Sequence, residues 1–356
     1  MTDTVRSRWV DSADAVPAGP FDGRFFCTTV AWTRAWEGVR AERVRAFRHL
    51  ALEGGPVPEL VPYYLVDHSP VWRGYEETAG VEPVWSGPVV FSSTVYGVHG
   101  GAGGSSAGYR ERAVDLGLEQ AQRWGAEALV FANLDGAEVD AWSAARPGGC
   151  PVLLDRAYEA PVGGSESAFL GRMTSKPRRE LGRQWRRALE SGVRLRVLTG
   201  AEMVPHLDEF TRLAIGSSEK HTDNIYGPEM FRSVTGVPGA VLLVAEHEGR
   251  MVGAFYCFLY RGRLSLVFAG LDNERMSELN TYAFLMYESL RYAVANDAEV
   301  INAGRCNYAY KERHGFDGAD VWTLVYPVGS RPEVTDALER MNKGMHEYLA
   351  LNTGRE

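Results

Sequence analysis

The hydrophobic and polar positions along the chain predict a regular mixture of strands and helices. Apolar runs rich in β-branched residues predict strands at residues 44–50, 61–66, 89–95, 128–134, 194–198, 240–246, 251–260, 263–269, 300–302 and 321–326. A helical period of apolar positions predicts helices at residues 109–124, 177–190, 201–215, 281–295 and 332–351. Strands and helices mixed in this way predict an α/β (α+β) fold.

The two halves of the chain share one order of elements. Each has strands, then a loop, a helix and a buried strand, over residues 89–134 in the first half and 263–302 in the second. This order indicates an internal duplication of structure. A stretch rich in proline and glycine, residues 144–166, lies between the halves and predicts a loop-rich boundary. We therefore expect one domain over residues 1–160 and a second over residues 161–356.

Composition places the chain among ordinary globular proteins. It has 356 residues, of which 45% are hydrophobic and 24% charged, so a disordered or fibrous class is excluded. The four cysteines are far apart and form no CxxC pair, which predicts a reducing compartment and neither a disulfide framework nor a metal site. The first ten residues have no apolar core, and no apolar run is long enough for a membrane span. We expect a cytoplasmic protein without membrane insertion.

Positive charge is concentrated in one segment, although the whole chain has a net charge of −8. Residues 172–196 hold nine basic and two acidic side chains, a net of +7. Arginine forks match phosphate oxygens bidentately, so the basic helix predicts a dock for a phosphorylated donor or acceptor. The candidate contacts are Lys176, Arg179, Arg183 and Arg187. The alternative is a solvated face without a ligand.

Two loops between a strand and a helix are candidate anion sites of opposite character. Residues 97–108 are rich in glycine, and backbone N–H groups beside a helix start bind anions. The candidate residues for binding the substrate or acyl donor there are Tyr96, Gly97, Gly100 and Gly101. The alternative is a surface loop without a ligand. Residues 271–280 have no glycine and include Asp272, Glu274 and Glu278, which disfavours a pyrophosphate at that place.

Two polar segments predict chemistry. Residues 305–311 follow a buried strand without apolar periodicity, and Arg305 and Asn307 are candidate binding residues. Tyr310 or Lys311 is the candidate acid or charge stabiliser, the alternative for Lys311 being a surface lysine beside Glu312. The polar residues 217–224 offer Glu219 or His221 as a general base. A strand bulge near residues 268–270 is expected to supply an N–H group to an oxyanion, and Cys306 is expected to be a small filling residue.

The basic helix and the glycine–valine after it, residues 169–193, resemble an element of the Fem-type aminoacyltransferases and the related CelD-like acyltransferases of the GNAT superfamily. Residues 290–316, with Tyr310-Lys311 followed by Gly315, resemble the ending of the same group, and Tyr96-Gly97 fits its first half. The resemblance implies two tandem GNAT-like domains, each a mixed, mostly antiparallel sheet flanked by helices. It also implies a functional lysine at Lys311.

The expected activity is an acyl transfer that forms an amide. By the resemblance, the donor is aminoacyl-tRNA and the acceptor a small amine or a peptide-nucleotide, as in peptidoglycan precursor or natural-product biosynthesis, with no tightly bound cofactor. One alternative is an N-acyltransferase that uses acyl-coenzyme A at the glycine-rich loop. Another is a non-catalytic RNA-binding or scaffold protein. The sequence leaves the oligomeric state open.

Overall fold

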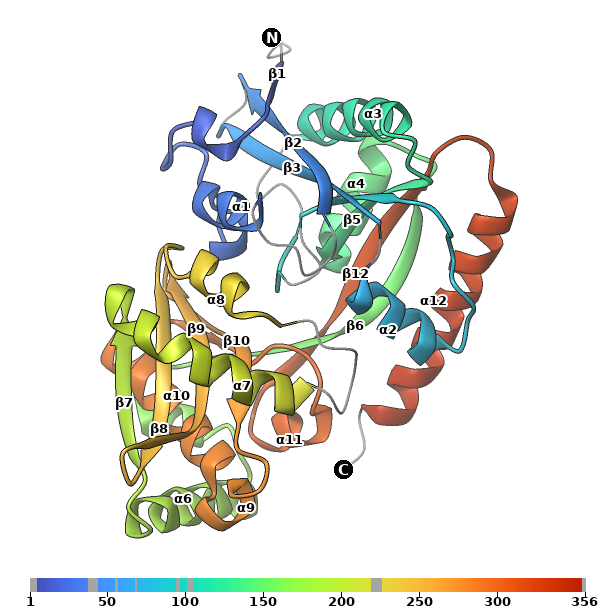
Figure 1. Ribbon diagram of the computed structural model, residues 1–356. Coiled ribbons are helices and arrows are strands. Elements are labelled where there is room, and N and C mark those ends of the chain that lie inside the picture. The colour runs from blue at the N-terminus through green and yellow to red at the C-terminus, as the bar shows by residue number, and fades with distance from the viewer. Residues whose placement is uncertain are drawn as a thin grey trace. The chain divides into compact units, whose positions relative to one another are not determined.

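The computed structural model describes residues 5–37, 44–54, 57–67, 69–93, 97–100, 106–218 and 226–353. The chain divides into two compact units. Unit 1 comprises residues 1–156 and 320–351, and unit 2 comprises residues 157–319 and 352–356. The colours of Figure 1 follow the chain through both units.

Unit 1 is built on a mixed sheet in the order β1-β2-β3-β4-β5-β12, with the first part of β6 beside β12. The strands are β1 (Arg6–Val10), β2 (Val44–Glu53), β3 (Glu59–Val66), β4 (Val89–Ser92), β5 (Ala128–Leu134), β6 (Cys150–Pro161) and β12 (Asp317–Pro327). The neighbours β4 and β5 run parallel, whereas the pairs β1–β2, β2–β3, β3–β4 and β5–β12 run antiparallel. A parallel pair requires a crossover, and helix α3 supplies it.

Helices cover this sheet. They are α1 (Val30–Glu37), α2 (Pro70–Ala79), α3 (Ala107–Arg123), α4 (Gly136–Ala145) and α12 (Pro332–Asn352), with the 3₁₀ turns η1 (Ala13–Ala15) and η2 (Phe26–Thr28). The apolar sides of α3 and α4 pack in one cluster with Tyr63 and Phe131, and α1 packs through Val30 in a separate cluster with Val10.

Ser69 caps α2 with its side chain, and Pro70 occupies the first helical position, where its missing N–H group costs nothing. Figure 1 shows α12 running alongside α2, and Gly344 permits the close approach to Ala79.

Unit 2 repeats the arrangement with a sheet in the order β11-β10-β9-β8-β7, beginning beside the second part of β6. The strands are β7 (Arg194–Thr199), β8 (Ala240–His247), β9 (Arg250–Tyr260), β10 (Arg263–Leu271) and β11 (Val300–Asn302). Here β10 and β11 form the parallel pair, and β7 to β10 are antiparallel neighbours. The expected duplication of strand, loop, helix and strand is therefore present in both units.

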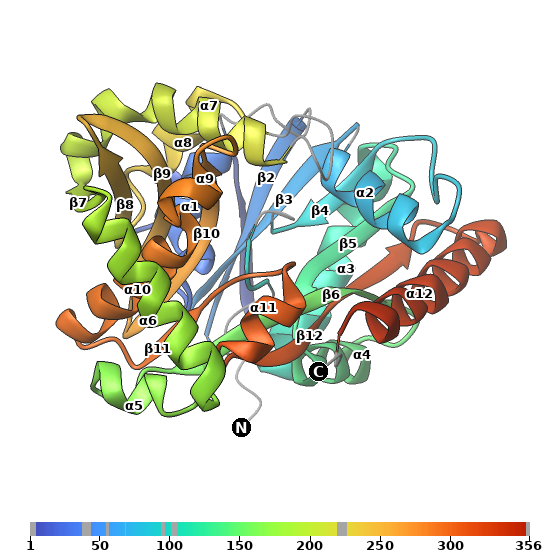
Figure 2. The same cartoon turned by 90° about the horizontal axis from the view of Figure 1, so that it is seen from below.

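The helices of unit 2 lie on both faces of its sheet, with α7 on one face and α6 and α10 on the other (Figure 2). They are α5 (Glu166–Leu170), α6 (Ser175–Glu190), α7 (Leu207–Ser218), α8 (Pro228–Val234), α9 (Met276–Leu279), α10 (Thr281–Ala295) and α11 (Tyr308–Arg313), with the 3₁₀ turn η3 (Gly200–His206). Helix α6 packs on α10 through Trp185, whose indole stacks on Tyr287 and donates to the buried Glu288 carboxylate at 2.7 Å.

The division between units differs from the one expected. The expected boundary at residue 160 lies within β6, and the change of unit occurs after Arg156. Residues 320–351, expected in the second domain, belong to unit 1. The physical reason is the pairing of β12 with β5, which brings α12 back to the first sheet.

Two helix glycines in unit 1 provide a matched test of this packing. A Cβ atom at Gly344 would lie within van der Waals overlap of the backbone carbonyl oxygen of Ala79, which cannot move aside easily, whereas a Cβ at Gly74 would meet no atom within 4 Å. We expect Gly344→Ala to lower the free energy of unfolding, because the clash outweighs the gain in helix propensity of about 1 kcal/mol. We expect Gly74→Ala to raise it by about 0.5–1 kcal/mol. Urea denaturation measures both, and equal effects of the two changes would refute the close α2–α12 contact.

Candidate active site

The candidate site lies where β10 and β11 stop pairing. Their parallel register runs from Arg263–Val300 to Ser265–Asn302 and ends there. The next residues of β10 form a bulge between Leu266 and Phe268, close to the bulge expected at residues 268–270. A pocket of about 220 Å³ opens beside the bulge. We call it the acyl pocket, and it is lined by Phe255, Leu266, Val267, Phe268, Ala269, Tyr282, Met286, Ala303, Gly304, Arg305, Asn307 and Lys311.

A left-handed turn brings the predicted polar segment into this pocket. Gly304, Cys306 and Asn307 have φ values of 69°, 61° and 51°. Glycine adopts this backbone conformation freely and asparagine tolerates it, but Cys306 holds it at a cost of about 1–3 kcal/mol. The turn ends in α11, so that Arg305, Asn307 and Lys311 line the acyl pocket. Cys306 is exposed, so the expectation that it fills space in the interior is wrong.

Lys311 is buried, and the alternative of a surface lysine is wrong. Its side chain is 3% exposed. The Nζ ammonium donates to the backbone oxygen of Arg305 at 2.5 Å and lies 5.7 Å from the centre of the Tyr158 ring. A buried ammonium requires such partners, because its desolvation is otherwise costly. The lysine therefore places positive charge at the wall of the acyl pocket and also fixes the turn at Arg305.

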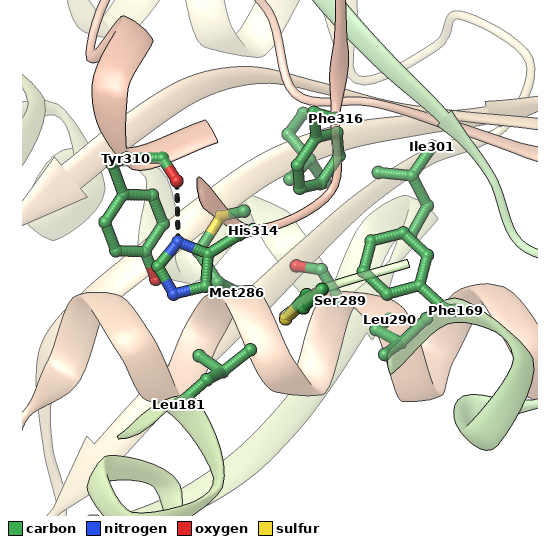
Figure 3. A pocket seen from close by; sticks show the side chains of 11 residues that line it. Phe169, Leu181, Met286, Ser289, Leu290, Ile301, Tyr310, His314 and Phe316 are labelled. Atoms are coloured by element: carbon green, nitrogen blue, oxygen red, sulfur yellow. Dashed lines mark hydrogen bonds between the residues drawn. The ribbon is translucent and has the colours of Figure 1, made fainter. Parts of the chain in front are cut away.

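Tyr310 carries a buried hydroxyl group for which the described residues offer no hydrogen-bond partner. Its ring meets Tyr282 edge to face at 5.0 Å and stacks on the His314 imidazole at 3.9 Å. His314 Nδ1 donates to the Tyr310 carbonyl oxygen at 2.6 Å, as the dashed line in Figure 3 marks. Burial raises the pKa of Tyr310 and lowers the pKa of His314. The phenol is therefore protonated and the imidazole neutral near pH 7.

A second, larger cleft of about 460 Å³ adjoins the acyl pocket and shares Tyr282 and Asn307 with it. We call it the polar cleft, and its other lining residues are Gln184, Ser217, Leu271, Asn273, Met276, Ser277, Asn280, Ala283 and Tyr310. None of these lining residues is charged. The loop with three acids lies here as expected, but Asp272, Glu274 and Glu278 do not line the cleft. Asp272 instead accepts the backbone N–H groups of the turn that follows it.

The basic helix α6 borders the polar cleft through Gln184. Its basic residues Lys176, Arg178, Arg179, Arg183, Arg186 and Arg187 are exposed, and Arg183 pairs with Glu180. At about 100° per residue, Lys176, Arg183 and Arg187 all lie within about 100° of Gln184 around the helix axis. The predicted apolar stripe faces inward, because Leu181 and Ala188 are buried. Lys176, Arg183 and Arg187 therefore form a row of cations along the rim of the cleft.

The remaining predicted residues divide into two groups. Tyr96, Gly101, Glu219 and His221 lie outside the described residues. Gly97 and Gly100 lie in unit 1, where Gly97 is buried and the Gly100 N–H group donates to the Asn133 carbonyl oxygen at 2.6 Å. The Gly100 N–H group is therefore already hydrogen-bonded to the backbone of unit 1. An anion site at the glycine-rich loop stays a prediction.

Sequence reasoning missed Tyr282, Met286 and the amides of the polar cleft. Tyr282 and Met286 lie on an apolar side of α10 that also faces the acyl pocket. An apolar helical period does not distinguish a side chain that packs in the core from one that lines a pocket. Among the described residues, no group of three or more His, Cys, Asp or Glu side chains is arranged to hold a metal ion. No helix in the described part of the chain is long and apolar enough to cross a membrane.

Comparison with known proteins agrees with this geometry. Residues 175–312 match the family model of the acetyltransferase (GNAT) domain, and they include every residue found to line the acyl pocket and the polar cleft. A search of the curated proteins found no significant match.

Similar solved structures share the fold at low sequence identity. FemX is 10% identical, with 82% of this chain and 90% of that chain covered at a TM-score of 0.58. The C-terminal domain of a putative lysylphosphatidylglycerol synthetase from Agrobacterium fabrum is 12% identical, with 80% of this chain and 84% of that chain covered at a TM-score of 0.54. L-PGS from Bacillus licheniformis is 11% identical, with 79% of this chain and 86% of that chain covered at a TM-score of 0.54. The resemblance expected from the sequence is confirmed: residues 175–312 match the acetyltransferase (GNAT) domain, and the chain shares the fold of FemX.

Proposed function

We propose that this acyltransferase takes an aminoacyl group from aminoacyl-tRNA and joins it to an amine acceptor as an amide. The observation that carries the proposal is the order of three surfaces. The cationic row of α6 borders an uncharged polar cleft, and this cleft leads into the acyl pocket. An RNA donor has the same order of parts: a phosphodiester chain, a terminal nucleoside and an acyl ester on its ribose.

The row on α6 has the chemistry that an RNA backbone requires. The exposed guanidinium groups can each meet a phosphate, and such contacts dominate nucleic-acid affinity. No acceptor for Lys176, Arg186 or Arg187 occurs among the contacts of the described residues, and the ion pair of Arg183 with Glu180 is exposed and therefore weak. These side chains can exchange water for phosphate at little cost.

The uncharged lining of the polar cleft favours a nucleoside over a pyrophosphate. Amide groups such as those of Gln184 and Asn273 both donate and accept, which suits ribose hydroxyls and base edges. The rings of Tyr282 and Tyr310 offer apolar faces beside them. A coenzyme A pyrophosphate would require cations or a cradle of backbone N–H groups, and none of the described residues that line this cleft is a cation or a glycine.

The reaction follows from the groups at the junction of cleft and pocket. The acceptor amine attacks the ester carbonyl carbon, so that a C–N bond forms and the bond to the ribose oxygen breaks. The Lys311 ammonium stabilises the negative charge of the tetrahedral intermediate. The Tyr310 hydroxyl gives its proton to the departing ribose oxygen, and the phenolate regains one from solvent. The amine loses its proton to a base, for which Glu219 and His221 stay the candidates.

An acyl-coenzyme A donor is the second candidate. It is favoured by the family model, which describes an acetyltransferase domain. The deciding experiment offers the purified protein the same acyl group on tRNA and on coenzyme A, with a panel of amines. Amide formation from the tRNA donor supports the proposal. Amide formation from the thioester alone would replace it by the second candidate.

Tyr310→Phe tests the proton donor. The change removes only a hydroxyl group that has no hydrogen-bond partner among the described residues, so we expect the free energy of unfolding to stay equal or rise by up to about 1 kcal/mol. We expect turnover to fall by about 10²–10³, because a positioned acid contributes about that much. Thermal unfolding and single-turnover kinetics measure the two effects.

Tyr256→Phe is the matched control for this change. The Tyr256 hydroxyl is also buried, but it donates to Phe231 and Thr235 and lies outside both pockets. We expect the Tyr256→Phe variant to have a free energy of unfolding lower by about 1 kcal/mol and an unchanged turnover. Full activity of Tyr310→Phe would remove the hydroxyl from the mechanism.

A triple change on α6 tests the RNA dock. We expect Lys176→Gln, Arg183→Gln and Arg187→Gln together to weaken tRNA binding and to reduce the slope of log K against log salt by about 0.7–0.9 for each lost phosphate contact. A variant with Arg123, Arg340 and Lys343 of unit 1 changed to Gln loses the same charge from exposed helix positions and should keep both affinity and slope. Equal behaviour of the two variants in a filter-binding titration would leave α6 as a solvated face.

A further inference from the structure

The floor of the acyl pocket is also the wall of a second cavity. Leu266 and Met286 line both the acyl pocket and a small void behind it. The void is lined almost wholly by apolar groups, from Phe169, Met173, Leu181, Leu290, Ile301 and Phe316, with Ser289, Tyr310 and His314 at its edge (Figure 3). Its volume is about 10 Å³, about the size of one water molecule, and an apolar void of this size stays dry.

The acyl pocket itself combines an apolar floor with positive charge. Phe255, Leu266 and Met286 offer apolar atoms, whereas Arg305 and Lys311 bring two cations to the wall, and none of the described residues that line the pocket has a carboxylate. A positively charged acyl side chain would meet these like charges in a half-enclosed site, where the repulsion is several-fold stronger than in water. An apolar side chain would meet the floor.

We infer that Met286, with Leu266, selects the transferred group, and that this group carries an apolar side chain. The inference rests on the proposed function, since it concerns the acyl group of that reaction. The acyl pocket has a volume of about 220 Å³, and Leu266 and Met286 separate it from the void behind, so the position of this floor limits the length of the acyl side chain that fits. Met286 is unbranched and can change rotamer, so it sets where the floor lies.

Shortening Met286 should join the two cavities. The void already leaves space behind the methionine side chain, so Met286→Ala extends the acyl pocket toward Leu181 and Ile301. The enlarged pocket should accept a bulkier acyl group. Met286→Leu keeps the volume but branches the side chain, so it should fold even where the alanine variant does not, and it should reduce turnover of the larger acyl groups.

The experiment measures acyl preference. One tRNA is charged with alanine, leucine, phenylalanine or lysine, and amide formation is followed for wild type, Met286→Ala, Met286→Leu and the control Met345→Ala, a buried methionine of unit 1. We expect wild type to favour leucyl over lysyl at least a hundredfold. We expect Met286→Ala to raise the phenylalanyl-to-alanyl ratio at least tenfold and the control to leave it unchanged. Unchanged ratios in folded variants, or equal use of lysyl, would overturn the inference.

Two further measurements separate this inference from the proposed function. The same ratios of acyl-group use are measured with propionyl-, isovaleryl- and phenylacetyl-coenzyme A. A change in these ratios that occurs with the thioesters but not with the charged tRNAs would reject the RNA donor and would still support the role of Met286 in the acyl pocket. Methionine methyl groups labelled with ¹³C are titrated with isovaleramide and with lysinamide, the Met286 signal being assigned from Met286→Leu. A shift of the Met286 methyl signal with isovaleramide alone supports the inference without turnover. No shift with isovaleramide, or an equal shift with lysinamide, refutes it.

Discussion

The end of the pairing between β10 and β11 depends on one buried amide, and the site depends on that end. Asn302 is fully buried. Its Nδ2 donates to a Glu159 carboxylate oxygen at 2.7 Å, and its Oδ1 accepts the Gly304 N–H group at 2.8 Å. The same carboxylate oxygen lies 2.7 Å from the Arg263 guanidinium at the start of β10. These bonds tie the end of β11 to β6 and to the start of β10, while the chain after Asn302 turns away, so the gap is a fixed feature.

In the turn after Asn302, the residues that line the acyl pocket are close to those with unfavourable backbone strain or a buried charge. Backbone strain at Cys306 and the burial of the Lys311 ammonium are both unfavourable unless the surroundings compensate for them. The bond from Lys311 to the Arg305 carbonyl closes the turn, and Gly304 leaves room for the carbonyl of Leu266 at 3.3 Å from where a Cβ would lie. Lys311 therefore fixes the turn that brings Arg305 and Asn307 into the pocket, besides its charge. A change at Lys311 would affect stability and chemistry together, whereas a change at Tyr310 separates them.

The sequence predicted those parts of the fold in which one periodicity dominates. Helices α6 and α10 lie within two residues of their expected bounds, because each has a clear apolar stripe. The region expected as a loop from residues 144 to 166 contains β6, a strand of twelve residues, because its many prolines and glycines outweighed its apolar positions. The polar segment at residues 305–311 was correctly placed beside the acyl pocket. Burial of Lys311 was not predictable, since it depends on Tyr158 and the Arg305 carbonyl, which only the tertiary fold brings near.

The duplication explains why the chemistry is assigned to unit 2. Both units contain a parallel strand pair joined by a helix, β4–β5 in unit 1 and β10–β11 in unit 2. In unit 1 the chain itself occupies the end of this pair: Gly100 donates to the Asn133 carbonyl, and a Cβ at Gly100 would overlap the carbonyl oxygen of Ala132. In unit 2 the corresponding ends separate around the acyl pocket. Two copies of one topology thus differ in whether the chain's own backbone or an open pocket lies at this place, and the residues that match the GNAT domain model belong to the copy with the pocket.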